Sequence, residues 1–181
     1  MYIKLPQTLT REIDKLSNHS LSNKDDIQKM RKRLTQGKLI RDENPEDHFC
    51  VMIVPFDREA GKVFLGNHKK ANDWIPPGGH IEKDESPVEA AIREAKEELD
   101  ITISEHQLRL FTPDHLDVSA PNKICKIHWH IWYLFNTEKT DYKFDRNEFS
   151  DAGWFTLEKA LQKIRIPTYR DIISRLMSSN I

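Results

Sequence analysis

Three glutamates, Glu94, Glu97 and Glu98, crowd one segment that has the pattern of an amphipathic helix. At about 100° per residue, positions i, i+3 and i+4 fall within roughly 100° of the helix circumference. Like charges at this spacing cost a helix roughly 0.2–0.5 kcal/mol per pair. Carboxylate oxygens gathered in this way suit hard cations such as Mg²⁺ or Mn²⁺. The segment therefore predicts either a metal-binding helix face or a charged face left in solvent.

An apolar stripe runs beside these glutamates, formed by Val88, Ala91, Ile92, Ala95 and Leu99. Its i, i+3, i+4, i+7 spacing predicts a helix face directed at the core, with the glutamates at the edge of the packed surface. The start of the helix is also specified. Ser86 is a good N-cap, Pro87 fits the first helical position, and Glu89 completes a capping box.

The spacing of the wider segment resembles the Nudix box, whose pattern is G-x5-E-x7-R-E-U-x-E-E-x-G-U with U a bulky apolar residue. The matching residues are Gly79, Glu85, Arg93, Glu94, Glu97, Glu98 and Ile101. Ala95 is a small version of U, and Asp100 replaces the second glycine. Aspartate tolerates the left-handed conformation that often ends a helix better than most residues do. We therefore expect the turn at Asp100 to survive and the site to remain competent.

This resemblance implies a Nudix-type α/β/α sandwich of the α+β class, with a mixed sheet between helices. It implies Mg²⁺- or Mn²⁺-dependent hydrolysis of a diphosphate bond in a nucleoside diphosphate derivative, without an organic cofactor. Glu97 and Glu98 are the first candidates for metal ligands, joined by Glu94 and the carbonyl of Gly79. Either Glu94 or a neighbouring carboxylate would act as the base, and the resemblance does not decide between them.

The family pattern also implies supporting residues around this cluster. Glu85 is expected to pair with Arg93 and fasten the loop to the helix. An acidic segment ahead of a Trp-Phe pair often supplies one more carboxylate to the metal, and here Glu148 is the candidate, with Asp151 behind it. The alternative is a non-catalytic nucleotide-sensing module on the same fold, although the intact acidic residues argue against it.

The charge balance places few constraints on the partner. The formal net charge is -1, so neither nucleic acid nor a membrane is an expected partner, and a homodimer stays open. Residues 1–41 carry ten Lys and Arg against four Asp and Glu, which gives +6 and leaves -7 for the rest. This basic segment is read as a solvated helical arm, with a partner-binding or polyphosphate-binding role as the alternative.

We expect residues 1–44 to form an N-terminal helical hairpin and residues 45–181 to form the Nudix domain. The polar, proline-containing connector at residues 42–47 supports a boundary there. Apolar runs at residues 48–56 and 126–136 predict buried strands. Residues 112–123 contain two prolines and predict a loop, while Thr168 is the expected cap of the final helix.

Histidines and cysteines are scattered along the chain. Cys50 and Cys125 form no CxxC motif, so no disulfide framework is predicted, and a reducing cytoplasm is the expected location. His128 and His130 should share one strand face. No third His or Cys at a recognisable spacing supports a zinc site with them, so a pocket-lining or hydrogen-bonded role is favoured. The other candidate pocket residues are His48, His68, Trp74 and His115.

Overall fold

The computed structural model describes residues 5–19, 22–121, 123–138 and 141–178. In chain order its helices and strands are α1 (Leu5–Ser17), α2 (Lys24–Leu34), β1 (Asp47–Asp57), β2 (Lys62–His68), β3 (Asp73–Ile75), β4 (Gly78–His80), α3 (Pro87–Leu99), the 3₁₀ turn η1 (Glu105–Gln107), β5 (Leu108–Asp117), β6 (Ile127–Asn136), β7 (Phe149–Thr156), α4 (Leu157–Lys163) and α5 (Pro167–Ser178). No helix among these described residues is long and apolar enough to cross a membrane.

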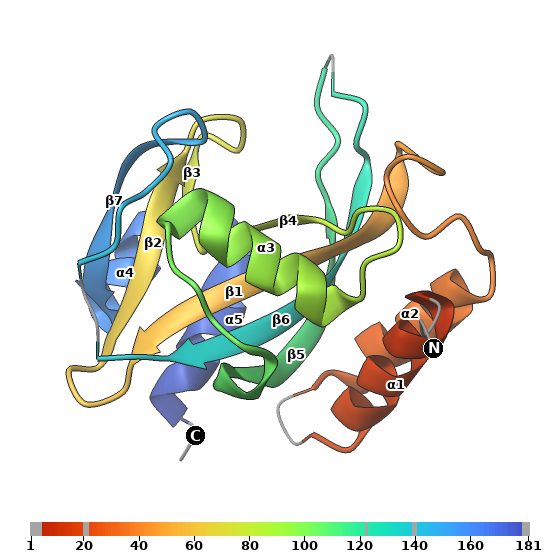
Figure 1. Ribbon diagram of the computed structural model, residues 1–181, viewed down its shortest axis with the longest axis horizontal. Helices are drawn as coiled ribbons and strands as arrows, with labels where there is room; N and C mark the ends of the chain where they lie inside the picture. The colour runs from red at the N-terminus through yellow and green to blue at the C-terminus, as the bar shows by residue number, and fades with distance from the viewer. Residues whose placement is uncertain (1–4, 20–21, 122, 139–140, 179–181) are drawn as a thin grey trace.

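The strands form one mixed sheet with the order β3-β2-β1-β6-β5 (Figure 1). β1 runs parallel to β6, whereas β5 is antiparallel to β6. β1 and β2 pair only beside their connecting turn, at Phe56 with Val63 and Asp57 with Lys62. Beyond that point the two strands diverge, β4 pairs with β1, and β7 pairs with β2. This divergence brings the two glycines of β4 beside β1 and close to α3.

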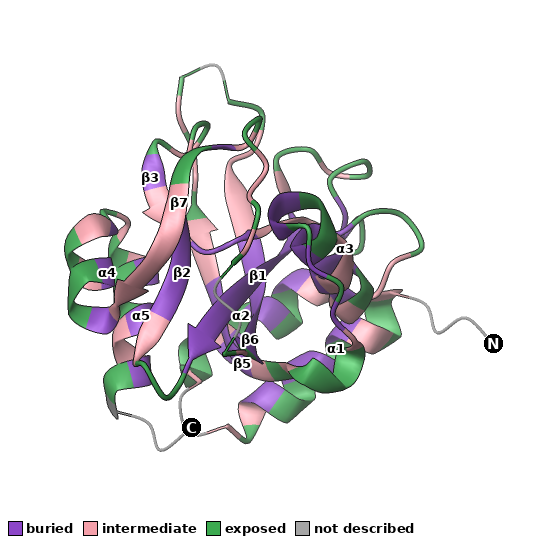
Figure 2. Ribbon diagram, turned by 60° about the vertical axis from the view of Figure 1, so that its left-hand side comes forward, coloured by how far each residue is buried: buried purple, intermediate pink, exposed green. Residues whose placement is uncertain are grey.

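Helices cover both faces of the sheet, as the α/β/α expectation requires (Figure 2). Alternate residues of β1 pack on opposite faces of the sheet, because successive side chains of a strand point in opposite directions. Phe49 and Val51 belong to the core cluster with α1, α2 and α3. Met52 and Val54 belong to the cluster with α4 and α5. The mixed sheet between helices is therefore confirmed.

The two N-terminal helices share the core of the sheet. Leu9, Ile13 and Leu16 of α1 and Met30 of α2 are fully buried, in the same cluster as Phe49 of β1. Burying such side chains is the main favourable contribution to folding. The hairpin is thus continuous with the sheet in packing, although residues 42–47 separate the two in sequence.

The predicted ends of the acidic helix are confirmed. The Ser86 side chain accepts a hydrogen bond from the Glu89 amide, the Glu89 side chain accepts from the Ser86 amide, and Pro87 opens the helix. Asp100 adopts the left-handed conformation with φ 53° and ψ 34°. The prediction for the start of the last helix is wrong by two residues, because α5 begins at Pro167 whereas a cap at Thr168 would start it at Tyr169. Proline suits the first helical position because its φ is fixed and its missing amide proton has no helical acceptor there.

The loop predicted for residues 112–123 is wrong over its first half. Residues up to Asp117 continue β5, with Pro113 opposite Ile131 of β6. β5 is the last strand in the sheet order, so the missing amide proton of Pro113 interrupts no ladder on its outer side. The register also shifts between Leu110 and Thr112, which is the kind of irregularity where a proline is accepted.

The pH dependence of stability should contain a contribution from Glu12 of α1, which is buried and accepts a hydrogen bond from the Tyr133 hydroxyl. Burial raises the pKa of Glu12 above its usual 4.5, although that hydrogen bond opposes the shift. The folded state then holds the proton more tightly than the unfolded state. The resulting stability is present in full below pH 4.5 and is lost as the pH rises through the folded-state pKa.

The substitution Glu12→Gln should therefore make the unfolding free energy of the chain higher at neutral pH and less dependent on pH. Urea unfolding at several pH values measures this. The matched control is Glu59→Gln in the exposed turn after β1, which should leave the profile unchanged. Parallel profiles for the Glu12 variant and the original chain would contradict the prediction.

Candidate active site

Two of the three glutamates lie buried where α3 meets β4. Glu94 and Glu98 are only 8% and 5% exposed, whereas Glu97 is exposed. Their i, i+4 spacing places both on the side of the helix that faces the sheet. The Gly78 amide donates a hydrogen bond of 2.8 Å to Oε2 of Glu98. A pair of carboxylates is thus held against the glycine backbone of β4.

This pair carries an electrostatic cost. Burial raises the pKa of Glu98 well above its ordinary value, and the charge of Glu94 raises it further, while the Gly78 amide opposes the shift. Burial also raises the pKa of Glu94, opposed by its hydrogen bond from Arg93. Two buried carboxylates side by side favour binding of a cation, because a cation offsets both the desolvation and the mutual repulsion.

Arg93 ties the helix to the loop before it. Its guanidinium donates to Oε1 of Glu85 at 2.8 Å and Oε2 of Glu85 at 3.1 Å, so the predicted pair is present. It also donates to the carbonyl oxygen of His80, to Glu94 at 2.8 Å and to Glu97 at 3.1 Å. One planar group with several donors therefore fixes the loop, β4 and the glutamates in one arrangement.

The glycines are required by close contacts. A Cβ on Gly79 would lie 2.2 Å from Oε1 of Glu94, so that carboxylate occupies the space a side chain would need. Gly78 has φ +154°, and a Cβ there would lie 2.3 Å from the carbonyl oxygen of Val51. The bare backbone of β4 thus lies directly against the acidic pair.

The donor set fits a hard divalent cation. The carboxylates of Glu94, Glu97 and Glu98 and the carbonyl of Gly79, whose Cα lies against Glu94, offer oxygen atoms only, which is the ligand chemistry that Mg²⁺ and Mn²⁺ prefer. The close approach of the Glu94 carboxylate to the bare backbone of Gly79, and the burial of Glu98 beside Glu94, support the same assignment.

The fourth candidate carboxylate already has cationic partners. Glu148, just before β7, is bonded by Lys70 Nζ at 2.8 Å and 3.1 Å, and its Oε2 lies 3.5 Å from Nε2 of His68. Its charge still contributes to the raised pKa of Glu98, so it lies near the acidic pair. Asp151, its alternative, is exposed and accepts a hydrogen bond from the Ala152 amide.

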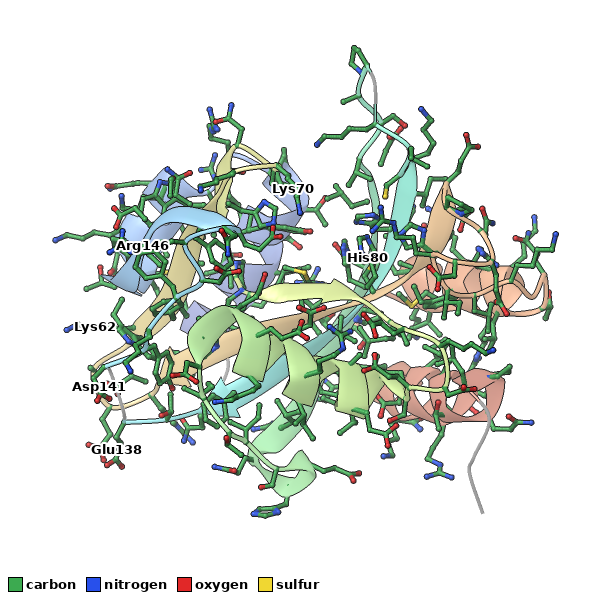
Figure 3. The ribbon with its side chains drawn as sticks, turned by 45° about the horizontal axis from the view of Figure 1, so that its top comes forward. Lys62, Lys70, His80, Glu138, Asp141 and Arg146 are labelled. Atoms are coloured by element: carbon green, nitrogen blue, oxygen red, sulfur yellow. The ribbon has the colours of Figure 1, made fainter. Side chains whose placement is uncertain are left out.

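Sequence reasoning missed Asp145. Its amide donates a 2.8 Å hydrogen bond to the carbonyl oxygen of Glu98, and its charge also raises the pKa of Glu98. No local pattern marks this residue, because its position depends on how the chain between β6 and β7 passes the end of α3. Lys70, in the turn between β2 and β3 (Figure 3), was also missed, because its contact with Glu148 depends on the pairing of β2 with β7.

The candidate pocket residues lie in different environments. His115 bonds Asp26 of α2 and stacks on Trp129, which ties a helix to the sheet. Trp74 lies beneath Lys163, whose Nζ is 4.0 Å from the centre of the ring. Neither residue contacts the acidic pair through these interactions.

His128 and His130 share a strand face as predicted, with ring centres 5.6 Å apart. His130 bonds Asp114 at 2.6 Å and lies 3.4 Å from the Tyr169 hydroxyl. His128 instead lies beside His48 and His80. Burial lowers the pKa of His48, and it lowers the pKa of His80 to about 3 and that of His128 to about 2. These three imidazoles are therefore neutral near pH 7.

A family model described as NUDIX domain matches residues 46–176, which is more than half of the chain. The chain belongs to the Nudix family. This Nudix hydrolase is an enzyme, and its box is the segment of β4 and α3 described above.

Curated relatives and solved structures agree with this assignment. The chain is 28% identical over 160 residues to a dihydroneopterin triphosphate diphosphatase of Haemophilus influenzae, covering 82% of this chain and 97% of the relative. It is 27% identical over 144 residues to an RNA pyrophosphohydrolase of Dinoroseobacter shibae, covering 72% and 89%. The E. coli dihydroneopterin triphosphate pyrophosphohydrolase has the same fold, with a TM-score of 0.62 at 19% identity over 72% of this chain and 96% of that one.

Proposed function

We propose that this Nudix hydrolase uses Mg²⁺ or Mn²⁺ to hydrolyse a diphosphate bond in a nucleoside diphosphate derivative. The observation that carries the proposal is the state of Glu98. It is buried beside Glu94, its hydrogen-bond donor is a backbone amide, and no cationic side chain of the described residues bonds it. A divalent ion held by these carboxylates would supply the missing positive charge.

The roles of the residues follow from their positions. Glu94, Glu97 and Glu98, with the Gly79 carbonyl, would hold the ion. Such an ion neutralises phosphate charge and lowers the pKa of water. A carboxylate of this group, with Glu94 the first candidate, takes the proton from the attacking water.

Two residues keep this group in place without contacting the reacting atoms. Arg93 donates to Glu85, to Glu94 and to the carbonyl of His80, and so holds loop, helix and β4 together. We propose that Arg93 and Glu85 act by fixing the position of the glutamates.

The relatives support hydrolysis of a pyrophosphate bond. One is named for a diphosphatase acting on dihydroneopterin triphosphate, and another for an RNA pyrophosphohydrolase. We infer the same bond type here, with a small nucleoside derivative ahead of RNA because the net charge of -1 provides no general attraction for a polyanion. A non-catalytic nucleotide-sensing role has no comparable support, since all three glutamates of the box are present.

The test is a substrate panel with Mg²⁺ and Mn²⁺, with release of phosphate and diphosphate as the readout. The panel contains nucleoside triphosphates, ADP-ribose, dinucleoside polyphosphates, coenzyme A, dihydroneopterin triphosphate and a 5′-triphosphorylated RNA. We expect metal-dependent turnover of a small nucleoside diphosphate derivative. Turnover of RNA alone would overturn the substrate class, and turnover that persists without a divalent ion would overturn the metal requirement.

The substitution Glu148→Gln should weaken metal binding more than it slows the reaction. Glu148 lies near Glu98 but is bonded by Lys70, so we expect it to support the site from outside or to join it when the ion binds. The Mg²⁺ concentration for half-maximal activity should rise by about tenfold, with a smaller change in kcat at saturating Mg²⁺. Asp151→Asn is the matched control and should leave both unchanged. An unaltered Mg²⁺ requirement for the Glu148 variant would remove this residue from the site.

A further inference from the structure

A second group of potential ligands lies outside the acidic pair and consists of His48 and Cys50 of β1, His80 of β4 and His128 of β6. One ligand atom from each lies within 4.8 Å of every other one. The centre of the His48 ring lies 4.8 Å from that of His80 and 4.9 Å from that of His128. Three strands therefore bring three imidazoles and one thiol to a single point.

The register of the sheet explains this convergence. His48 is directly opposite His128 in the parallel pair, and Cys50 is directly opposite His80 in the antiparallel pair. Opposite residues point to the same side of a sheet, and so do residues two apart on one strand. All four side chains thus lie on the sheet face that Met52 shares with α4 and α5. The box helix α3 covers the other face.

Two nitrogens of this cluster lack the hydrogen-bond partners that buried polar atoms usually have. His48 is fully buried, and its Nδ1 lies 2.9 Å from the carbonyl oxygen of Asn44. A carbonyl can only accept, so Nδ1 carries the proton and Nε2 carries a free lone pair. The Nε2 atoms of His48 and His128 are both buried without a hydrogen-bond partner. Most buried side-chain polar atoms have a hydrogen-bond partner, so two unpaired nitrogens in one cluster call for a ligand.

We propose that His48, Cys50, His80 and His128 form a zinc site that fastens β4 to β1 and β6. Three imidazoles and one thiolate are ligands that Zn²⁺ accepts, while Mg²⁺ prefers oxygen. Ideal tetrahedral bonds place ligand atoms about 3.3–3.6 Å apart, so the group closes with shifts below about 1 Å per atom. The Cys50 proton leaves to solvent as the zinc–sulfur bond forms. The Asn44 carbonyl holds the His48 ring in the required tautomer, as outer partners of metal ligands do.

The neighbouring His130 and Cys125 are excluded as ligands by their own contacts and positions. His130 is opposite Cys50 on β6, but Asp114 and Tyr169 engage its two nitrogens. Cys125 Sγ lies 4.0 Å from Nε2 of His80, outside the four-residue group. With four protein ligands the ion has no open position, so its role is structural. β4 is only three residues long, and its Gly78 amide bonds Glu98, so the zinc site holds a strand that the box depends on.

The test is the metal content of the chain of residues 1–181. The protein is purified without chelator and dialysed against metal-free buffer. Mass spectrometry should then find one zinc ion per chain, held by these four ligands. Cobalt(II) in place of zinc should give the intense visible bands of a tetrahedral site and a thiolate-to-cobalt charge-transfer band. A folded protein that gives no such band and loses zinc on dialysis would overturn the proposal.

Variants assign the ligands. His48→Asn keeps an amide nitrogen near the position of Nδ1 for the Asn44 carbonyl while removing Nε2, so it should lower zinc content by at least about tenfold. Cys50→Ser should abolish the charge-transfer band. Cys125→Ser and Glu98→Gln should both keep the zinc. Unchanged zinc content with His48→Asn, a charge-transfer band that persists with Cys50→Ser, or a band lost with Cys125→Ser instead would overturn the assignment.

Discussion

Replacing Glu98 with glutamine should lower kcat/KM for the diphosphate substrate by about 10³-fold, because a bound metal ion supplies several kcal/mol of transition-state stabilisation. Glu98 is the most buried of the three box glutamates. Glutamine keeps an oxygen that accepts from the Gly78 amide, so the contact with β4 survives while the charge is lost. The loss should therefore come from the missing ligand and not from a disordered loop.

Two further measurements separate these causes. Without metal, the variant should unfold at a temperature equal to or higher than the original chain, because it removes one of two crowded carboxylates. Added Mg²⁺ should raise the unfolding temperature of the original chain much more than that of the variant. The control Glu82→Gln changes an exposed residue of the loop before α3 and should leave activity unchanged. Equal Mg²⁺-dependent turnover by the Glu98 variant would refute this site for the reaction.

Removing residues 1–44 should cost the remaining chain most of its stability. Leu9, Ile13, Leu16 and Met30 are fully buried against the sheet. At roughly 1.5–3 kcal/mol for each buried side chain, their loss is comparable to the whole net stability of a domain, roughly 5–15 kcal/mol. The deletion also leaves Asp47 without its ion pair to the buried Arg33. We expect residues 45–181 alone to bind a hydrophobic dye and to lack a cooperative thermal transition by circular dichroism.

Point variants test the same packing within the whole chain. Leu9→Ala and Ile13→Ala should each lower the unfolding free energy by about 2–5 kcal/mol. Gln28→Ala, on the exposed side of α2, should change it by less than about 0.5 kcal/mol. If residues 45–181 unfold at the same temperature as the full chain, the hairpin is a dispensable arm, as its basic composition first suggests.

Local patterns predicted the elements whose geometry is local. The helix of the box could be placed from Ser86 to Asp100 because capping, helical periodicity and the left-handed end depend on neighbours a few residues apart. The Glu85–Arg93 pair follows from the same short-range spacing once the family is recognised. The second half of β5 was missed because Pro113 reads as a strand breaker, and only the order of the strands shows that it occupies an edge.

By itself the sequence determined the acidic helix and its glycine loop, since these residues lie within one continuous segment, and the resemblance of that segment to the Nudix box predicted the reaction class. Only the tertiary structure decided which groups surround them. Lys70 follows β2 and meets Glu148, just before β7, because these two strands pair in the sheet. His48, His80 and His128 lie far apart in the chain, and no spacing rule joins them. Strand register brings them together, and register is set by the packing of the whole sheet, which no short stretch of sequence contains.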